Sequence, residues 1–223
     1  NDDSIAINKA IYSLPPEGGV VNFPHGTWVL KDRININRNN VYLKGNGSTL
    51  FCPKPLADIY GENKNWSWSS GFIVLSPNGK NTTLGKIRAV ADDGNTKVEV
   101  DWTDGQPISG EWVQIWWYND MGSDSLLTWL YGDAVNSDKY GTEMQTATTP
   151  RIKSWFKVVS VNGHTLELDP PLPLPANPTW KPTLMKVPHL QNCIVDGFQF
   201  EFIESQYPGH LKERGHNCIS VSS

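Results

Sequence analysis

The chain has 223 residues, a formal net charge of -4 and a mean hydropathy of -0.42. No apolar run approaches the roughly 20 residues that a membrane-spanning helix requires, and no basic stripe of the kind that binds nucleic acid is present. The composition therefore argues against a membrane span and against a nucleic-acid partner. Ten tryptophans, 19 glycines and 16 prolines instead indicate a turn-rich, all-β protein with aromatic surfaces.

A helix is predicted for residues 2–14. Asp3 or Ser4 can cap its start, and its isoleucines recur mainly along one stripe. Pro15 ends it, because proline lacks the amide hydrogen that a continuing helix needs. Short strands are expected to follow at 18–24, 25–30 and 34–36.

Three short segments each begin with Asn and continue as an alternating, strand-like run: Asn40-Val41-Tyr42-Leu43, Asn192-Cys193-Ile194-Val195 and Asn217-Cys218-Ile219-Ser220. The second and third begin 25 residues apart, and a recurrence of roughly 20 to 50 residues is typical of repeat architectures. We therefore expect a parallel β-helix, in which each coil stacks on the one before. This register places Cys193 beneath Cys218, as a disulfide or as a free pair of thiols.

Four further segments occur in a familiar order: Asp2-Asp3-Ser4, Gly18-Gly19-Val20-Val21-Asn22-Phe23-Pro24-His25-Gly26-Thr27-Trp28, Ile34-Asn35-Ile36 and Val41-Tyr42-Leu43-Lys44-Gly45-Asn46-Gly47-Ser48-Thr49. Together they resemble the start of pectate-lyase-superfamily proteins, over residues 2 to about 52 and again around 187–221. The resemblance implies a right-handed parallel β-helix whose open end is capped by the helix. It does not select an activity, because the superfamily includes polysaccharide lyases, glycoside hydrolases, epimerases and phage tailspikes.

The chain is predicted to divide into three segments. Residues 1–78 hold the capping helix and the first coils, and residues 187–223 resume the coils. Between them, 79–186 carries strand-like alternation and the hairpin signals Asp93-Gly94 and Asn162-Gly163. We therefore expect an antiparallel β-subdomain inserted in the β-helix.

Within this insertion, residues 122–150 are expected to form a long loop, and the proline-rich stretch 170–182 a stiff, extended return to the coils. The sequence stops at Ser223 part-way through a strand, so we expect a C-terminal companion fragment or chain to complete the β-helix and cover its strand edges. The start at Asn1 without a methionine and three glycosylation sequons favour a processed, secreted glycoprotein.

The densest run of reactive side chains contains the predicted catalytic residues, which are His210, Lys212, Glu213, Arg214 and His216. A uronate lyase needs a base beside the sugar carboxylate and a cation or hydrogen-bond donors that neutralise it. Here a histidine or the lysine would be the base, and Arg214 would clamp the carboxylate. Alternatively, the run is a solvated corner loop in which Glu213 pairs with a neighbouring cation.

A glycoside hydrolase would instead need two carboxylates roughly 5 to 9 Å apart. The candidates are Asp196, Glu201 and Glu204, although no paired acidic motif supports them.

The aromatic centre of the insertion is a predicted strand in which Trp112, Gln114 and Trp116 share one face and Val113, Ile115 and Trp117 the other. One set should be core. The other is predicted to stack on sugar rings, together with Trp129, Tyr131 and Tyr207. The alternative is that both faces are buried.

No motif requires a cofactor, and no zinc-type Cys/His spacing occurs. Ca²⁺ prefers oxygen ligands, and the candidate positions for it are Asp92 with Asp93, Asp101 with Asp104, and Asp120 with Asp124.

The sequence thus predicts an extracellular protein that acts on a polysaccharide partner. The favoured hypothesis is a polysaccharide lyase that cleaves a uronate-containing glycan by β-elimination. A glycoside hydrolase on the same scaffold and a non-catalytic glycan-binding surface, adhesion or tailspike module are the alternatives.

Overall fold

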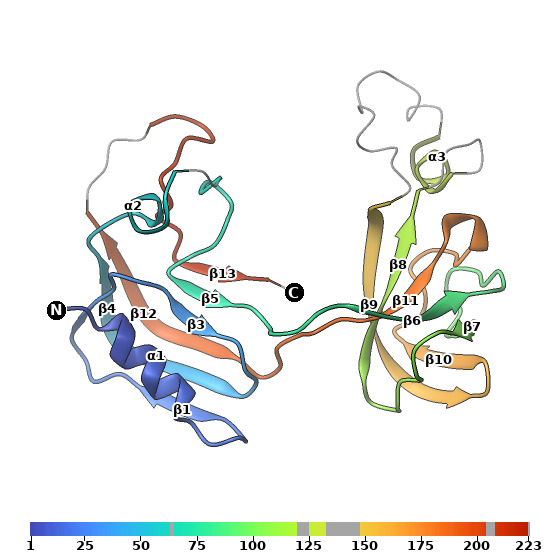
Figure 1. The fold of residues 1–223 in the computed structure, drawn as a ribbon, viewed down its shortest axis with the longest axis horizontal. Coiled ribbons are helices and arrows are strands. Elements are labelled where there is room, and N and C mark those ends of the chain that lie inside the picture. Colours follow the sequence, from blue (N-terminus) through green and yellow to red (C-terminus); the bar gives the residue numbers. More distant parts are fainter. Residues whose placement is uncertain (63–64, 120–124, 133–147, 204–207, 223) are drawn as a thin grey trace. The chain divides into compact units, whose positions relative to one another are not determined.

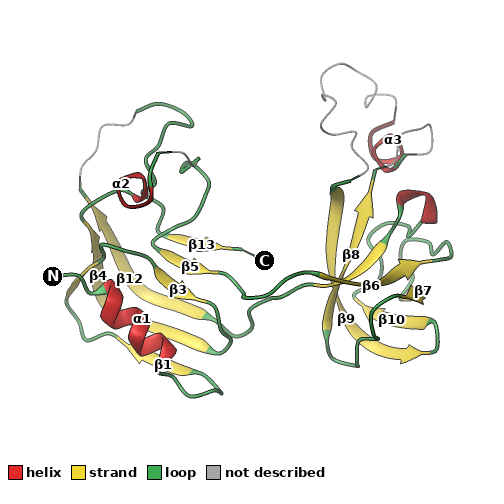
Figure 2. Cartoon of the chain, viewed as in Figure 1, coloured by secondary structure: helices red, strands yellow, loops and turns green. Residues whose placement is uncertain are grey.

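The computed structural model describes residues 1–62, 65–119, 125–132, 148–203 and 208–222 (Figure 1). It consists mostly of strands with few helices (Figure 2). The chain divides into two compact units, of which one combines Asn1–Gly79 with Pro188–Ser223 and the other is Lys80–Val187. We call the first the coil unit and the second the barrel unit. The prediction from the sequence had set the boundaries of the middle segment at 79 and 186.

Every strand pair described in the coil unit is parallel. In its first sheet, β4 (Val41–Cys52) lies between β12 (Ile194–Phe202) and the two short strands β1 (Gly19–Asn22) and β2 (Thr27–Val29). In its second sheet, β5 (Ile73–Leu75) lies between β3 (Ile34–Ile36) and β13 (Ile219–Val221). Three passes of the chain each contribute first to one sheet and then to the other.

Buried and exposed residues alternate along these strands. The buried residues of both sheets face one common core. The fully buried strand residues include Ile34, Ile36, Leu43, Leu50 and Ile73, which belong to one apolar cluster. Burying a side chain of this size contributes roughly 1.5 to 3 kcal/mol. This cluster is therefore the main stabilising feature of the coil unit.

Helix α1 (Ser4–Tyr12) packs against β3 and adds two buried isoleucines to this core. It is shorter than predicted, and neither side chain expected to cap it does so. The Asp3 carboxylate instead accepts the amide hydrogen of Val29, at the end of β2, with an N–O distance of 2.8 Å. The buried Ser4 hydroxyl donates to the carbonyl oxygen of Asp32 at 3.0 Å. The start of the helix is thus fixed to the chain between β2 and β3.

The predicted register of the Asn repeats is wrong. Asn192 stacks on Asn40, donating from Nδ2 to Oδ1 at 2.9 Å, and both residues have left-handed backbone conformations with φ of 55° and 59°. Asn tolerates this conformation better than most residues. Asn217 and Cys218 precede β13 in the other sheet, so Cys218 does not lie above Cys193. The two segments that are 25 residues apart lead into β12 and β13. These strands belong to different sheets within one pass of the chain, and are not equivalent strands of two successive passes.

The barrel unit is a closed barrel of antiparallel strands in the order β10-β7-β6-β11-β8-β9. Their bounds are β6 (Thr82–Ile87), β7 (Lys97–Trp102), β8 (Trp112–Tyr118), β9 (Pro150–Asn162), β10 (Thr165–Asp169) and β11 (Thr183–Lys186). Strand orientations are thus mixed in the chain as a whole. The hairpin predicted at Asn162-Gly163 is confirmed, because β9 pairs with β10 across it and Gly163 has a φ of 60°.

The barrel core contains Val113, Ile115 and Trp117, so this face of β8 is the inward one of the two that the sequence left open. Part of the stretch predicted as a loop forms helix α3 (Leu126–Tyr131), and most of that stretch lies outside the described residues. The proline-rich return is more than a spacer, since it contributes the buried residues Leu172, Leu174 and Trp180 to the barrel core. None of the described helices is long and apolar enough to cross a membrane.

Candidate functional site

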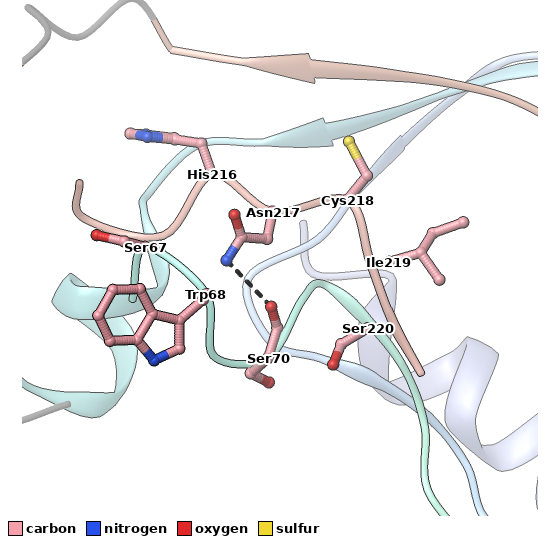
Figure 3. A pocket seen from close by; sticks show the side chains of 8 residues that line it. All are labelled: Ser67, Trp68, Ser70, His216, Asn217, Cys218, Ile219 and Ser220. Atoms are coloured by element: carbon pink, nitrogen blue, oxygen red, sulfur yellow. Dashed lines mark hydrogen bonds between the residues drawn. The ribbon is translucent and has the colours of Figure 1, made fainter. Parts of the chain in front are cut away.

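One groove of the coil unit joins side chains from two distant segments. It has a volume of about 560 Å³ and is lined by Ser67, Trp68, Ser70, His216, Asn217, Cys218, Ile219 and Ser220 (Figure 3). The first three lie in the loop before β5, and the others lead into β13 or belong to it. We call it the Trp68 groove. The predicted reactive run therefore reaches this groove through His216.

A buried tryptophan anchors the loop before β5. Trp66 is 2% exposed, and its Nε1 donates to the carbonyl oxygen of Gly61 at 2.8 Å. The guanidinium carbon of Arg33 lies 3.9 Å from the ring centroid of Tyr60 and 5.4 Å from that of Trp66. A cation over two aromatic faces stabilises both rings.

Asn217 joins the two walls of the groove. Its side-chain amide donates to the carbonyl oxygen of Trp66 at 2.8 Å and to that of Ser70 at 3.1 Å. The second of these bonds is drawn in Figure 3. Because carbonyl groups on both sides of Trp68 are held, the backbone that carries this side chain has a defined position.

The segment before His216 is docked on helix α2 (Leu56–Tyr60). The amide of Leu56 donates to the carbonyl oxygen of Gly215 at 3.0 Å, and the amide of Ala57 donates to that of Arg214 at 2.9 Å. Amides of a first helical turn have no partner within their own helix, so these bonds satisfy them. Gly215 has a φ of 86°, and a Cβ there would lie 2.9 Å from the Cβ of Leu56, so glycine is the residue that fits.

Arg214, the predicted carboxylate clamp, is already engaged by carboxylates of the protein. Its Nη2 pairs with Asp58 Oδ1 and, at 2.7 Å, with Glu62 Oε1. The carboxylate of Glu213, another member of the run, accepts a hydrogen bond from the Ser67 hydroxyl. Both residues therefore fix the position of the segment that leads to His216 and the groove.

His216 is half-buried, and its ring meets that of Phe202 edge-to-face with the centroids 5.4 Å apart. Burial lowers the pKa of His216 below its ordinary value of 6.5, and the positive charge of Arg214 lowers it further, whereas Asp58 acts in the opposite sense. The imidazole is therefore neutral at pH 7, with one nitrogen that donates and one that accepts. In this state it can hydrogen-bond a sugar hydroxyl or take a proton.

Trp68 was not among the residues singled out from the sequence, yet it is the most exposed tryptophan that the structure describes, at 67%. The available signal was the run Asn65-Trp66-Ser67-Trp68-Ser69-Ser70, in which tryptophans alternate with hydroxyl residues. The same run begins with one of the three glycosylation sequons, Asn65-Trp66-Ser67. An exposed indole beside serine hydroxyls and a neutral imidazole is suited to a ligand with flat apolar faces and hydroxyl edges.

The other predicted members of the reactive run do not line this groove. His210 and Lys212 are both exposed, and the backbone turns between Gly209 and Lys212. Tyr207 lies outside the described residues.

The predicted glycosidase carboxylates also lie elsewhere. Asp196 and Glu201 are exposed on β12, and Asp196 accepts a hydrogen bond from the Tyr42 hydroxyl at 3.3 Å. Glu204 lies outside the described residues. The described part of the chain does not bring these carboxylates together with His216 in the groove.

The predicted sugar-stacking aromatics of the barrel unit belong to two places. Trp112 and Trp116 lie on the outer face of β8, and Trp112 is 36% exposed. Trp129 and Tyr131 belong to α3 and are 53% and 56% exposed. The Trp129 ring leans on the buried ring of Trp180 at a centroid distance of 5.2 Å.

The three cysteines are free thiols. Burial raises the pKa of Cys52 to about 12 and also raises that of Cys218, which lines the groove. Both are therefore protonated at neutral pH and unsuited to nucleophilic attack.

Among the predicted Ca²⁺ positions, Asp101 has another partner. Asp101 pairs with Arg88 at 3.4 Å, and no group of three or more His, Cys, Asp or Glu side chains in the described ranges could hold a metal ion. Asp120 and Asp124 lie outside these ranges.

No family model matches the chain, and no curated protein matches it. Solved structures do. The tailspike of Acinetobacter baumannii bacteriophage AP22, in complex with A. baumannii capsular saccharide, aligns over 90% of this chain with a TM-score of 0.51 and 13% identity. The chain is similar in fold to phage tailspikes.

Two Pseudomonas phage tailspikes extend this likeness. That of phage phi297 aligns over 89% of the chain with a TM-score of 0.54 and 14% identity, and that of phage LKA1 over 89% with 0.51 and 12%. The chain covers 26%, 27% and 31% of the AP22, phi297 and LKA1 chains, respectively. The resemblance to the pectate-lyase superfamily is thus supported only loosely, through the general type of fold.

Proposed function

We propose that this chain is a glycan-binding unit of a tailspike-type protein and that the Trp68 groove holds a sugar residue of the glycan. The observation that carries the proposal is the 67% exposure of Trp68 on a loop whose flanking carbonyls are fixed by Asn217. An exposed indole offers a flat apolar face on which a sugar ring can stack, and a backbone that is already ordered loses little further entropy on binding.

The proposed contacts follow from the lining of the groove. One pyranose ring stacks on the Trp68 indole, and its hydroxyls exchange hydrogen bonds with Ser70, Ser220 and the neutral His216. The AP22 tailspike was solved with a capsular saccharide, which supports a glycan as the ligand class. Such a unit would act outside the cell that carries the glycan.

We also propose that the coil unit is part of a right-handed parallel β-helix. The parallel pairing in both sheets and the likeness to tailspikes support it. Among the described strands, β12 and β13 each pair on one side only, and Ile194 and Val221 are 50% and 76% exposed. Further parallel strands, from a companion segment, would pair with these edges and cover the two side chains.

A second candidate function is β-elimination on a uronate-containing glycan. The neutral His216 in the groove favours it, because a lyase requires an unprotonated base beside its substrate. Arg214 is engaged by Asp58 and Glu62, so the sugar carboxylate would have to be neutralised by another group. For this reason glycan binding is the first candidate function and β-elimination is the second.

A panel of acidic and neutral bacterial polysaccharides tests both candidates. Calorimetric titration measures binding, ultraviolet absorbance detects an unsaturated elimination product, and a reducing-end assay detects hydrolysis. We expect binding that Trp68→Ala weakens about tenfold, corresponding to roughly 1.4 kcal/mol. Tyr12→Ala, which removes an exposed aromatic ring from α1, should leave it unchanged. Equal affinity of wild type and Trp68→Ala for every bound glycan would contradict the proposal.

A further inference from the structure

The outer face of β8 and β9 has an unusual composition. Three consecutive outward cross-strand pairs are Trp112 with Lys157, Gln114 with Trp155, and Trp116 with Lys153. The residues between them on each strand point inward, since Val113, Ile115 and Phe156 belong to the barrel core. Three indoles and two ammonium groups therefore share one face of two neighbouring strands.

Three of these side chains are in contact, since Trp116 meets both Lys153 and Gln114. The Lys153 ammonium lies 4.5 Å from the ring centroid of Trp116. Gln114, in the middle of the face, is 5% exposed and accepts a hydrogen bond from Trp116 Nε1 through its own Oε1. Trp112, Lys153 and Lys157 remain exposed. The face thus combines rings set against the sheet with accessible positive charge.

The charge of this face is opposite to that of the whole chain. The chain carries a net charge of -4, whereas the six paired positions hold two lysines and no acidic residue, and β10 places one carboxylate, that of Asp169, opposite Lys157. Such a face attracts anions, and its rings are suited to the apolar faces of sugars.

We propose that the outer face of β8 and β9 is a second glycan-binding surface, specific for an acidic, carboxylate-bearing polysaccharide. Sugar rings stack on the indoles, and carboxylates meet Lys153 and Lys157. Trp112 and Trp116 are four residues apart along a strand, which corresponds to about 13 Å, so one oligosaccharide segment can contact both. This surface belongs to the barrel unit and does not depend on the Trp68 groove.

The test measures binding of the full chain to polygalacturonate, alginate and hyaluronate, and to the carboxyl-reduced, neutral form of each. The double variant Lys153→Ala/Lys157→Ala is compared with Lys86→Ala/Lys97→Ala, which removes the same charge from exposed positions on β6 and β7 of the same barrel. Trp112→Ala tests the stacking contribution, and Trp68→Ala separates this surface from the groove.

We expect at least one acidic polymer to bind, with an affinity that falls about tenfold in Lys153→Ala/Lys157→Ala and in the carboxyl-reduced form. The control double variant should bind as the wild type does, and added salt should weaken wild-type binding, because salt screens exposed charges. Equal losses in the two double variants would mean non-specific attraction and would overturn the proposal, as would failure of all three acidic polymers to bind.

Acidic-polymer binding that disappears in Trp68→Ala but survives in Lys153→Ala/Lys157→Ala would also overturn this proposal while leaving the groove proposal intact. The opposite pattern would support the barrel surface as a binding site separate from the groove. Circular dichroism of each variant checks that the barrel remains folded.

Discussion

In the coil unit, the residues that build the Trp68 groove come from distant parts of the chain, whereas in the barrel unit the aromatic face is made by two strands of one local sheet. Asn217 bonds to the carbonyl group of Trp66, 151 positions away in the sequence. Lys153 and Trp116 meet across a single strand pair. The aromatic face of β8 and β9 can therefore be predicted from strand periodicity in the sequence. The Trp68 groove cannot, because it depends on contacts between distant segments.

The two units also differ in how their strand edges are satisfied. The barrel closes on itself, so each of its strands is paired on both sides. In the coil unit, β12 and β13 have one unpaired side among the described strands. Open edges are sites where another strand can add. The coil unit is thus the part of the molecule suited to extension, and the barrel unit is structurally self-contained.

The largest effects should come from the two cores, and a matched pair of variants tests whether they are independent. Leu43 of β4 and Leu166 of β10 are both 0% exposed. Leu43→Ala and Leu166→Ala should each lower the free energy of unfolding by about 2 to 5 kcal/mol, because each leaves a cavity in a packed core. Differential scanning calorimetry should show a different transition shifted in each variant. One shared transition that moves equally in both would contradict the independent unfolding of the two cores.

A smaller effect is expected from the glycine that lets the reactive run dock on α2. Gly215→Ala combines a left-handed φ of 86° with a contact of 2.9 Å to Leu56. It should destabilise the coil unit by more than the 1 kcal/mol or so that an unfavourable φ alone costs, and it should weaken glycan binding. Gly163→Ala is the control, since it has a φ of 60° but no atom within 4 Å of the added Cβ. Equal destabilisation in urea titrations of the two variants would show that the contact with Leu56 is unimportant.

The smallest effect concerns pH. Because the pKa of His216 is lowered in the folded state, the unfolded chain binds the proton more readily. The wild type should therefore lose stability as the pH falls through the ordinary value of 6.5 and below, and His216→Gln should lose less over the same interval. The measurement is the difference in unfolding free energy between the two proteins from pH 8 to pH 5. His210→Gln, which removes an exposed histidine, is the control, and identical pH profiles of wild type and His216→Gln would refute the argument.

Sequence patterns predicted the features that depend on neighbouring residues. The division of β8 into two faces and the Asn162-Gly163 hairpin follow from period-two alternation and from turn chemistry, which are local, although alternation alone did not tell which face of β8 is inward. The start of α1 was misjudged because Asp3 and Ser4 bond to another segment instead of capping the helix. Helix α3 was missed because its six residues have too little length for a clear period.

The site was harder to predict because its parts meet only through tertiary contacts. The reactive run drew attention to Arg214 and Glu213, but carboxylates and a hydroxyl of the coil unit satisfy these side chains. Trp68 was missed because no sequence pattern tells an exposed tryptophan from a buried one, and its neighbour Trp66 is 2% exposed. The Asn register failed for a related reason, since the same short motif begins strands in two different sheets.

The most direct measurement is a crystal structure of the chain with an oligosaccharide cut from the glycan that binds best in the panel. The account predicts a sugar ring stacked on the Trp68 indole, with its hydroxyls within hydrogen-bonding distance of His216 or Ser220. An occupied site elsewhere in the coil unit, with the Trp68 ring exposed to solvent, would contradict the assignment of the groove as the place where the glycan binds.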